Sequence, residues 1–262
     1  MKKNGLILFD IDGVIRSVEN SYRRSLKKTV HKFTGWEPSY KDIDSAKNEG
    51  IWNNDWDLSL EFIKKNTESK NVNLPIPSRE VVINCFNNFY FGGNTNRDVK
   101  DWSGFIKNEE LLVDKNFFDI LNKNRIIWGF VSGAELASAK FVLETRLKLK
   151  SPPLVAMEDA PGKPNPEGLI NLSKKLLGEE FGQSKIPIAY IGDTIADIRT
   201  VMNAREAISN QRFISMGIAP PHLHIKSRLN ERNEYETNLR NAGADLILES
   251  IYDLISINLG LF

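Results

Sequence analysis

The chain has 262 residues, which is long enough to bury a full hydrophobic core in one large domain or in a domain with a sizeable insertion. The 35 Lys and Arg residues balance 34 Asp and Glu residues, so the net charge of +1 gives no electrostatic reason to expect a nucleic acid as partner. A single cysteine, Cys85, excludes an internal disulfide, and no apolar run reaches the roughly 18 residues that span a bilayer. We therefore expect a cytoplasmic protein, a monomer or a homodimer, with no membrane partner.

The chain begins with a predicted buried strand that ends in two carboxylates. The residues from Leu6 to Phe9 are all apolar, as in a strand covered on both faces of a parallel sheet. Asp10 and Asp12 follow, and in an extended chain both side chains leave on the same side. Gly13 then lets the backbone turn away. An ordinary turn after a strand is the alternative reading of this stretch taken alone.

A close pair of carboxylates suits phosphoryl transfer. Because both groups cannot ionise freely, one can attack phosphorus while the other holds a proton for the leaving group. An aspartyl-phosphate intermediate splits one difficult hydrolysis into two easier steps. A carboxylate that attacks an anionic phosphate needs a cation between them, and Mg²⁺ with its oxygen ligands can supply it.

A helical insertion is expected after this strand. Apolar residues recur at spacings of three and four from Ser17 to Thr34, which predicts an amphipathic helix ended by Gly35. The following stretch has no strand of the Leu6 to Phe9 type. Further helices are predicted at residues 40–48, 56–66 and 78–91. We therefore expect a helical cap domain at residues 17–108, inserted into an α/β core domain of residues 1–16 and 109–262.

Strands and helices alternate in the rest of the chain. Strands are predicted at residues 125–131, 154–157, 186–192, 213–218 and 245–248. Helices are predicted at residues 109–124, 134–147, 165–177 and 250–259, and the segment 226–236 begins as a loop and becomes helical toward Asn241. This alternation predicts the α/β class, with a Rossmann-like parallel sheet flanked by helices.

Polar side chains follow several of the predicted strands, at the edge of a parallel sheet where ligands bind. Ser132 and Gly133 begin a helix and offer a hydroxyl and free amides to a phosphate oxygen, although an ordinary helix cap explains Ser132 equally well. Lys163 stands in a loop that two prolines stiffen, where an exposed lysine is the alternative. Asp193 and Asp197 follow a strand, and Asp197 also suits the start of a helix.

Four stretches together resemble the motifs of the haloacid dehalogenase (HAD) superfamily. In chain order they are Asp10-Ile11-Asp12-Gly13-Val14, Val131-Ser132-Gly133, Lys163-Pro164-Asn165-Pro166 and Gly192-Asp193-Thr194-Ile195-Ala196-Asp197. The resemblance covers nearly the whole chain and points to the subfamily with a helical cap after the first motif, similar to phosphoglycolate phosphatases and β-phosphoglucomutases. It implies a HAD-like core with an inserted α-helical cap.

The resemblance implies Mg²⁺ as cofactor and a role for each acidic residue. Asp10 would be the nucleophile and a metal ligand. Asp12 would be the general acid and then the base, with its backbone carbonyl on the metal. Asp193 would bind the metal directly, and Asp197 would bind it through water or orient Lys163.

The phosphoryl group would be held by the second and third motifs. The resemblance implies that Ser132 and the amide of Gly133 bind it, and that Lys163 pairs with Asp10 and with the phosphoryl oxygens. The implied activity is that of a phosphatase acting on a small phosphorylated metabolite. A phosphomutase of the same family and a non-catalytic phosphate-binding protein are the alternatives.

Two stretches are candidates for substrate recognition. Arg16 and Ser17 depart from the family's first motif, and Arg16 could bind a second anionic group of the substrate or be a solvated hinge residue. In the expected cap, the polar residues Asn53, Asn54 and Asp55 follow Trp52 and could bind substrate hydroxyls while the indole covers a flat face. Alternatively, Asn54 or Asp55 caps the next helix and the tryptophans pack between helices.

Overall fold

The structure of this protein is a computed structural model that describes residues 3–49, 52, 54–69, 75–93, 98–183 and 185–256. The chain divides into two compact units. One consists of Met1–Ser17 and Leu111–Phe262, and we call it the core unit. The other is Val18–Glu110, which we call the helical unit. Each unit is described by itself.

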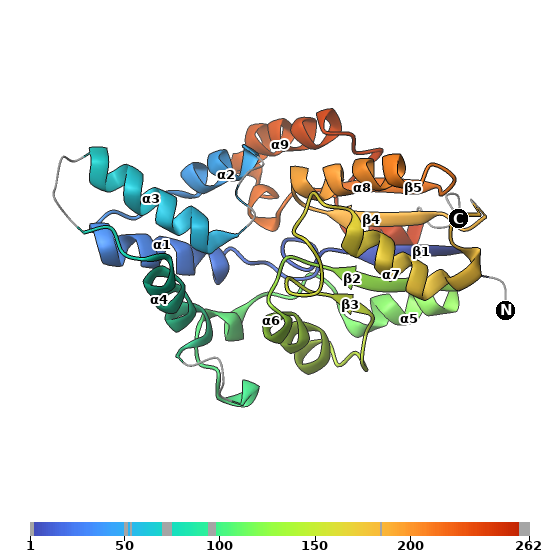
Figure 1. Cartoon of the computed structure of the whole chain (residues 1–262), viewed down its shortest axis with the longest axis horizontal. Coiled ribbons are helices and arrows are strands. Elements are labelled where there is room, and N and C mark those ends of the chain that lie inside the picture. Colours follow the sequence, from blue (N-terminus) through green and yellow to red (C-terminus); the bar gives the residue numbers. More distant parts are fainter. Residues whose placement is uncertain are drawn as a thin grey trace. The chain divides into compact units, whose positions relative to one another are not determined.

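The core unit is built on a parallel sheet of six strands in the order β3-β2-β1-β4-β5-β6 (Figure 1). The strands are β1 (Gly5–Phe9), β2 (Ile126–Val131), β3 (Leu154–Val155), β4 (Ile188–Gly192), β5 (Phe213–Ile218) and β6 (Leu246–Leu248). Phe9 at the end of β1 pairs with Phe130 of β2 and with Ile191 of β4. The carboxyl ends of these three strands therefore meet at one edge of the sheet.

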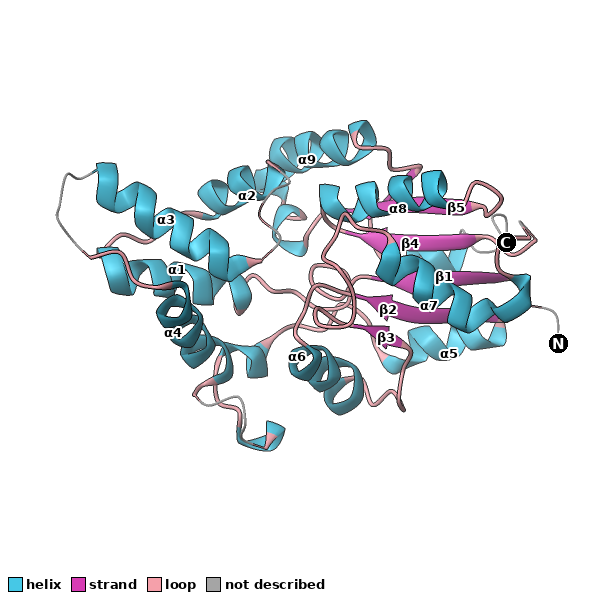
Figure 2. Cartoon of the chain, in the orientation of Figure 1, coloured by secondary structure: helices cyan, strands magenta, loops and turns pink. Residues whose placement is uncertain are grey.

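Helices cover both faces of this sheet (Figure 2). They are α5 (Lys115–Lys123), α6 (Leu136–Lys140) with its π-helical continuation η3 (Phe141–Arg146), α7 (Glu167–Leu177), α8 (Ile195–Ala207) and α9 (Leu229–Asn241). Ile7 and Phe9 pack with α5 and η3 on one face, whereas Leu6 and Leu8 pack with α7 and α8 on the other. Because alternate residues of β1 serve opposite layers, the strand is apolar throughout, and the predicted α/β fold is confirmed.

The helical unit contains α1 (Tyr22–Thr34), α2 (Tyr40–Asn48), α3 (Asp55–Ser69) and α4 (Arg79–Phe91). Aromatic contacts hold it together: the ring centroids of Tyr22 and Tyr90 lie 4.2 Å apart, and Trp56 meets Phe86 edge-on. Gly35 ends α1 with a φ of 69°, which L side chains rarely adopt. Short 3₁₀ turns are η1 (Val99–Asp101) and η2 (Phe105–Asn108) here, and η4 (Gly178–Glu180), η5 (Pro221–Leu223) and η6 (Lys226–Arg228) in the core unit.

Four predicted helices differ from the structure. The helix predicted from Ser17 begins at Tyr22, and the one predicted from Glu109 begins at Lys115, because Asp114 accepts a hydrogen bond of 3.0 Å from the amide of Phe117 and caps α5 there. The helix predicted at residues 134–147 changes to a π-helix at Phe141. Of the helix predicted at residues 250–259, residues 253–256 are helical, residues 250–252 form a bend and a turn before them, and residues 257–259 lie outside the described residues. No helix in the described part of the chain is long and apolar enough to cross a membrane.

Candidate active site

Asp10 lies at the end of β1 with only 6% of its surface exposed. Its amide donates to the carbonyl of Ile191 at 2.8 Å, so the residue stays in register with β4 although the strand itself ends at Phe9. Burial raises the pKa of the Asp10 carboxyl to about 6, and the negative charges of Asp197 and Asp12 add to this against the opposing charge of Lys163.

Asp12 follows a bend at Ile11 and forms an isolated parallel bridge with Arg16. The amide of Ile15 donates to the carbonyl of Ile11 at 2.8 Å, so the chain bends immediately after Asp10. The Asp12 carboxylate accepts a hydrogen bond of 2.6 Å from Nε of Arg16. The turn therefore fixes where Asp12 lies, and the charge of Asp12 is close enough to Asp10 to help raise the pKa of the Asp10 carboxyl. That both carboxylates leave on the same side stays a prediction.

Ser132 follows β2 and is buried, with its amide donating to the carbonyl of Val155 at 3.0 Å. Its hydroxyl accepts a hydrogen bond of 3.2 Å from the amide of Ala134, which turns the chain toward α6. Gly133 is exposed, and a Cβ added there would meet no heavy atom within 4 Å. This loop leaves the Gly133 backbone accessible to a ligand.

Lys163 joins two of the acidic residues. Its ammonium lies 2.9 Å from Oδ1 of Asp10 and 2.5 Å from Oδ1 of Asp197, and 15% of its side chain is exposed. Burial alone would lower the pKa of Lys163, but the charges of Asp10 and Asp197 raise it well above its ordinary value. Lys163 therefore stays protonated and offsets much of the negative charge around it.

Asp197 completes the capping box of α8, whose N-cap is Thr194, and holds Lys163 at the same time. Its Oδ2 accepts hydrogen bonds from the hydroxyl and the amide of Thr194, at 2.6 Å and 3.0 Å, while Oδ1 faces Lys163. Burial alone would raise the pKa of Asp197, but Lys163 and Thr194 together hold it below its ordinary value. This capping box could be read from Thr194 and the acid three residues later, which is a common helix start.

Sequence reasoning missed Tyr190. Its hydroxyl lies 2.9 Å from the carbonyl of Val131 and 3.0 Å from Oδ1 of Asp197, and it can donate to one of them at a time. Burial raises the pKa of Tyr190 well above its ordinary value, so the hydroxyl stays protonated. Tyr190 thereby connects the end of β2, next to Ser132, with the acid that holds Lys163. Its place in an apolar strand gave no sign of this polar contact.

Asp193 follows β4 and is 8% exposed. It approaches the first motif so closely that a Cβ on Gly13 would lie 2.1 Å from Asp193 Oδ2. Gly13 also has a φ of +78°, so both its conformation and its surroundings require glycine. A Cβ on Gly192 would likewise lie 2.2 Å from Cβ of Asp197. Gly13 therefore allows the first and fourth motifs to pack together, and Gly192 makes room for Asp197 within the fourth motif.

Asp10, Asp193 and Asp197 form a buried acidic group in which one oxygen of each lies within 4.8 Å of the others. Carboxylate oxygens are the ligands that Mg²⁺ prefers, and three buried acids with one lysine leave excess negative charge for a cation to offset. The donor set therefore fits a magnesium ion. Both oxygens of Asp197 already face protein donors, which leaves Asp10 and Asp193 as the better ligands of the three.

The predicted substrate residues of the helical unit have local partners in the structure. Asn54 caps α3, with its Oδ1 accepting from the amide of Asp57 at 2.8 Å. Asp55 is buried and pairs with Lys47 at 2.7 Å, and Nε1 of Trp52 donates to Glu49 at 3.2 Å. Asn53 lies outside the described residues. The capping alternative thus holds for Asn54, and a role of this stretch in substrate binding stays a prediction.

Glu135, next to the Ser132 loop, is a half-buried acid that the motifs do not include. Burial and the neighbouring charge of Glu158 raise the pKa of the Glu135 carboxyl to about 7. A raised pKa means that the folded protein holds the proton more tightly than the unfolded chain does. The stability that this gives is complete below the ordinary pKa of 4.5 and is lost as the pH rises through about 7.

We therefore expect Glu135→Gln to leave stability nearly unchanged at pH 5 and to raise the free energy of unfolding by about 2 kcal/mol at pH 8. Urea unfolding of both proteins at several pH values measures this difference. Glu234→Gln, at an exposed position of α9, is the control and should show no such trend. If Glu135→Gln changed the free energy of unfolding equally at pH 5 and at pH 8, the raised pKa of Glu135 would be contradicted.

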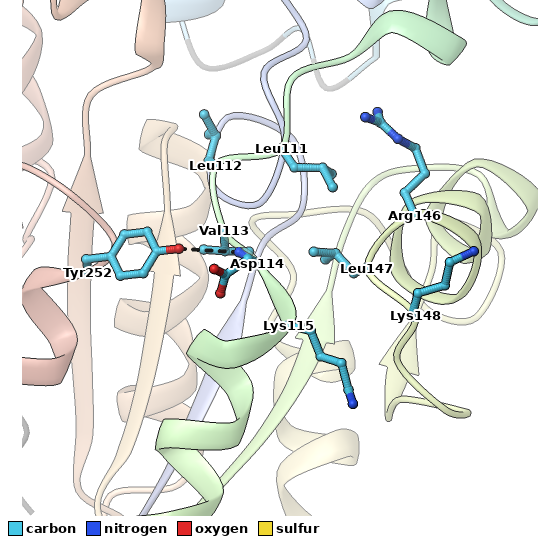
Figure 3. Close-up of a pocket in the computed structure, with 9 residues that line it drawn as sticks. All are labelled: Leu111, Leu112, Val113, Asp114, Lys115, Arg146, Leu147, Lys148 and Tyr252. Carbon is cyan, nitrogen blue, oxygen red and sulfur yellow. Dashed lines mark hydrogen bonds between the residues drawn. The ribbon is translucent and has the colours of Figure 1, made fainter.

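A cavity of about 460 Å³ elsewhere in the core unit contains none of the motif residues. Figure 3 shows the segment from Leu111 to Lys115 on one side of it and the segment from Arg146 to Lys148 on the other. The Tyr252 hydroxyl accepts a hydrogen bond of 3.3 Å from the amide of Asp114 (Figure 3). No residue that lines this cavity belongs to the group around Asp10.

The strand ends of the parallel α/β sheet thus gather buried aspartates and a lysine. A family model of haloacid dehalogenase-like hydrolases matches residues 5–204. The chain therefore belongs to the haloacid dehalogenase-like hydrolase family.

Similar proteins are known by sequence and by structure. The chain is 30% identical over 228 residues to a Phytophthora nicotianae protein named imidazoleglycerol-phosphate dehydratase, and this match covers 86% of the chain but only 45% of that protein. Among solved structures, a phosphonoacetaldehyde hydrolase-like protein from Oleispira antarctica matches with a TM-score of 0.66 and 15% identity, covering 97% of this chain and 91% of the other. Phosphatase Tt82 from Thermococcus thioreducens matches with a TM-score of 0.60 and 22% identity, covering 90% and 99%. At these identities the two structures show the shared fold.

Proposed function

We propose that this protein is a Mg²⁺-dependent phosphatase that hydrolyses a small phosphorylated metabolite through an aspartyl-phosphate on Asp10. The observation that supports it most directly is the placement of Lys163 between two buried carboxylates, Asp10 and Asp197, at the carboxyl edge of the sheet. A lysine there can pair with a phosphoryl group as well as with the nucleophile. A binding protein would not need a buried aspartate beside the phosphate.

Asp10 is the nucleophile in this proposal. Its carboxylate attacks phosphorus, the ester bond to the leaving alcohol breaks, and Asp12 gives the alcohol its proton. Asp12 then takes a proton from a water molecule that attacks the aspartyl-phosphate, which releases inorganic phosphate and restores Asp10. About 29% of the Asp12 side chain is exposed, compared with 8% for Asp10, so water and the leaving group can reach it.

The phosphoryl oxygens bind to Ser132, to the amide of Gly133 and to Lys163. The exposed backbone of Gly133 and the protonated Lys163 supply hydrogen bonds to the negative charge that spreads over these oxygens in the transition state. Tyr190 and Asp197 keep Lys163 in place, since both lie in one buried hydrogen-bonded network with it.

The metal would be held by Asp10, by Asp193 and by the backbone carbonyl of Asp12, with Asp197 in contact through water or solely through Lys163. When bound, Mg²⁺ offsets the repulsion between the carboxylate and the anionic phosphate. The close approach of Asp193 to Gly13 supports this ligand set, because it brings the first and fourth motifs to one point.

One relative suggests a candidate substrate. The Phytophthora nicotianae protein carries the name of a dehydratase of imidazoleglycerol phosphate, and the part that this chain matches is less than half of it. A phosphatase segment in such a protein would act on a phosphate ester that bears an imidazole ring. Imidazoleglycerol phosphate therefore belongs in the substrate panel, beside sugar phosphates, phosphoglycolate and p-nitrophenyl phosphate.

The proposed activity predicts phosphate release that needs a divalent metal. With Mg²⁺ present, we expect turnover of p-nitrophenyl phosphate and of at least one metabolite of the panel, and EDTA should lower it by at least about 100-fold. Added Mg²⁺ in excess of EDTA should restore the rate. Inorganic phosphate assays measure both effects, and full activity in EDTA would contradict the proposed cofactor.

A phosphomutase is the alternative that the same residues allow, because Asp12 would serve it equally well. Product analysis separates the two activities: a mutase converts a sugar phosphate to its isomer, whereas a phosphatase yields free phosphate. Stoichiometric binding without turnover across the whole panel would instead favour a phosphate-binding protein.

A further inference from the structure

Arg16 is a fully buried arginine next to the first motif. None of its side chain is exposed, and it is the largest of the fully buried side chains among the described residues. Its Nε donates to Oδ1 of Asp12 at 2.6 Å. A buried guanidinium needs an acidic partner, because a charge without one is costly away from water. Asp12 is such a partner, and the two residues therefore form one unit.

The backbone around Arg16 is held from two directions within the core unit. The Arg16 carbonyl accepts from the amide of Gly13 at 2.8 Å, which closes the turn. Arg16 also forms an antiparallel bridge with Leu111, and the amide of Leu112 donates to the Ile15 carbonyl at 2.9 Å. Leu111 and Leu112, labelled in Figure 3, belong to the segment that pairs with Ile15 and Arg16. With its backbone fixed, the guanidinium sets where the Asp12 carboxyl can lie.

We propose that Arg16 is a positioning residue that fixes which oxygen of Asp12 exchanges protons with the substrate. This inference rests on the proposed function, in which Asp12 is the general acid and base. Because Oδ1 accepts the Nε hydrogen, the exchangeable proton of Asp12 belongs on Oδ2. The hydrogen bond to Oδ1 persists whether Oδ2 carries a proton or not, so the carboxyl keeps its orientation through both chemical steps.

Oδ2 of Asp12 donates a proton in the first step and accepts one in the second. In the first, the Asp10–phosphorus bond forms, the bond from phosphorus to the leaving oxygen breaks, and the proton on Oδ2 passes to that oxygen. In the second, Oδ2 takes a proton from the attacking water while the water oxygen bonds to phosphorus and Asp10 is released. If the Asp12 carboxyl could rotate freely, its proton would often point away from the leaving oxygen. The rate would then fall most for substrates whose leaving group needs protonation.

The test compares substrates that differ in how much they need a general acid. Ethyl phosphate has a poor leaving group, whereas p-nitrophenyl phosphate leaves as a stable anion with little help. For Arg16→Met we expect kcat/KM to fall by about 30-fold to 100-fold for ethyl phosphate and by about 3-fold or less for p-nitrophenyl phosphate. KM should change little for either. Arg16→Lys keeps a cation in the turn and should recover part of the ethyl phosphate activity.

Three comparisons identify the cause of any loss. Arg23→Met removes an arginine of similar burial that pairs with Asp44 in the helical unit, and it should leave the ratio between the two substrates unchanged. In an Asp12→Asn protein, adding Arg16→Met should have no further effect on that ratio. Thermal unfolding of each variant establishes that it is folded. If Arg16→Met does not fold, the kinetic comparison is made with Arg16→Lys instead.

Two results would overturn the inference. Equal losses for both substrates would mean that Arg16 acts solely on stability, and a raised KM confined to substrates with a second anionic group would mean that it binds the substrate. A different result would contradict the proposed function itself. If Asp12→Asn itself keeps full activity on ethyl phosphate, Asp12 is not the general acid, whatever Arg16→Met does.

Discussion

Asp10→Asn should abolish the proposed phosphatase activity, with a fall in kcat of about four orders of magnitude or more. The neutral amide cannot attack phosphorus, and it also removes one proposed ligand of Mg²⁺. The substitution keeps the shape of a residue that is 6% exposed, so we expect the fold to survive. Phosphate release under saturating substrate and Mg²⁺ measures the change.

The same variant tests the covalent intermediate. Wild-type protein quenched during turnover should carry one phosphoryl group on the peptide that contains Asp10, detectable by mass spectrometry, and Asp10→Asn should carry none. Asp114→Asn is a suitable control, because asparagine caps a helix as well as aspartate does and α5 should keep its start. Full activity in Asp10→Asn would show that another residue is the nucleophile.

The sheet could be predicted from sequence because its strands are buried on both faces. Uninterrupted apolar runs such as the one from Leu6 to Phe9 occur where both neighbouring layers are apolar, and β1 serves two separate core layers. Helix starts were less predictable. Apolar spacing extends into segments that do not form helix, and the start of α5 depends on a single hydrogen bond from the amide of Phe117 to Asp114.

The sequence pointed to residues of the candidate site where a single residue type can perform the required task. Glycine at residue 13 and acids at 10 and 193 are such cases, since their chemistry has few substitutes. The contacts of Tyr190 and Arg16 were not accessible, because each depends on which side chain a neighbouring segment brings close. Tyr190 reaches Asp197 across the start of α8, and Arg16 reaches Asp12 across the turn that follows Asp12.

Replacement of Lys163 should have the second-largest effect. We expect Lys163→Met to lower kcat by about 1,000-fold, since the phosphoryl oxygens lose a cation in the transition state. The charge of Lys163 also holds down the pKa of Asp10, so its removal raises that pKa above about 6 and leaves less carboxylate at neutral pH. Part of the lost activity should therefore return as the pH rises from 6 to 8. Steady-state kinetics across this range measures both effects.

Stability should fall together with activity, because two buried acids lose the cation between them. Removing one partner of a buried ion pair costs about 3 kcal/mol, which urea unfolding at pH 7 can measure. Lys115→Met, at an exposed position in α5, is the control and should be nearly neutral. In the double variant Lys163→Met and Asp197→Asn, stability should partly recover, since Asp197 no longer carries an unpaired charge, while activity stays low. Recovery of activity in the double variant would mean that Lys163 serves merely to neutralise Asp197.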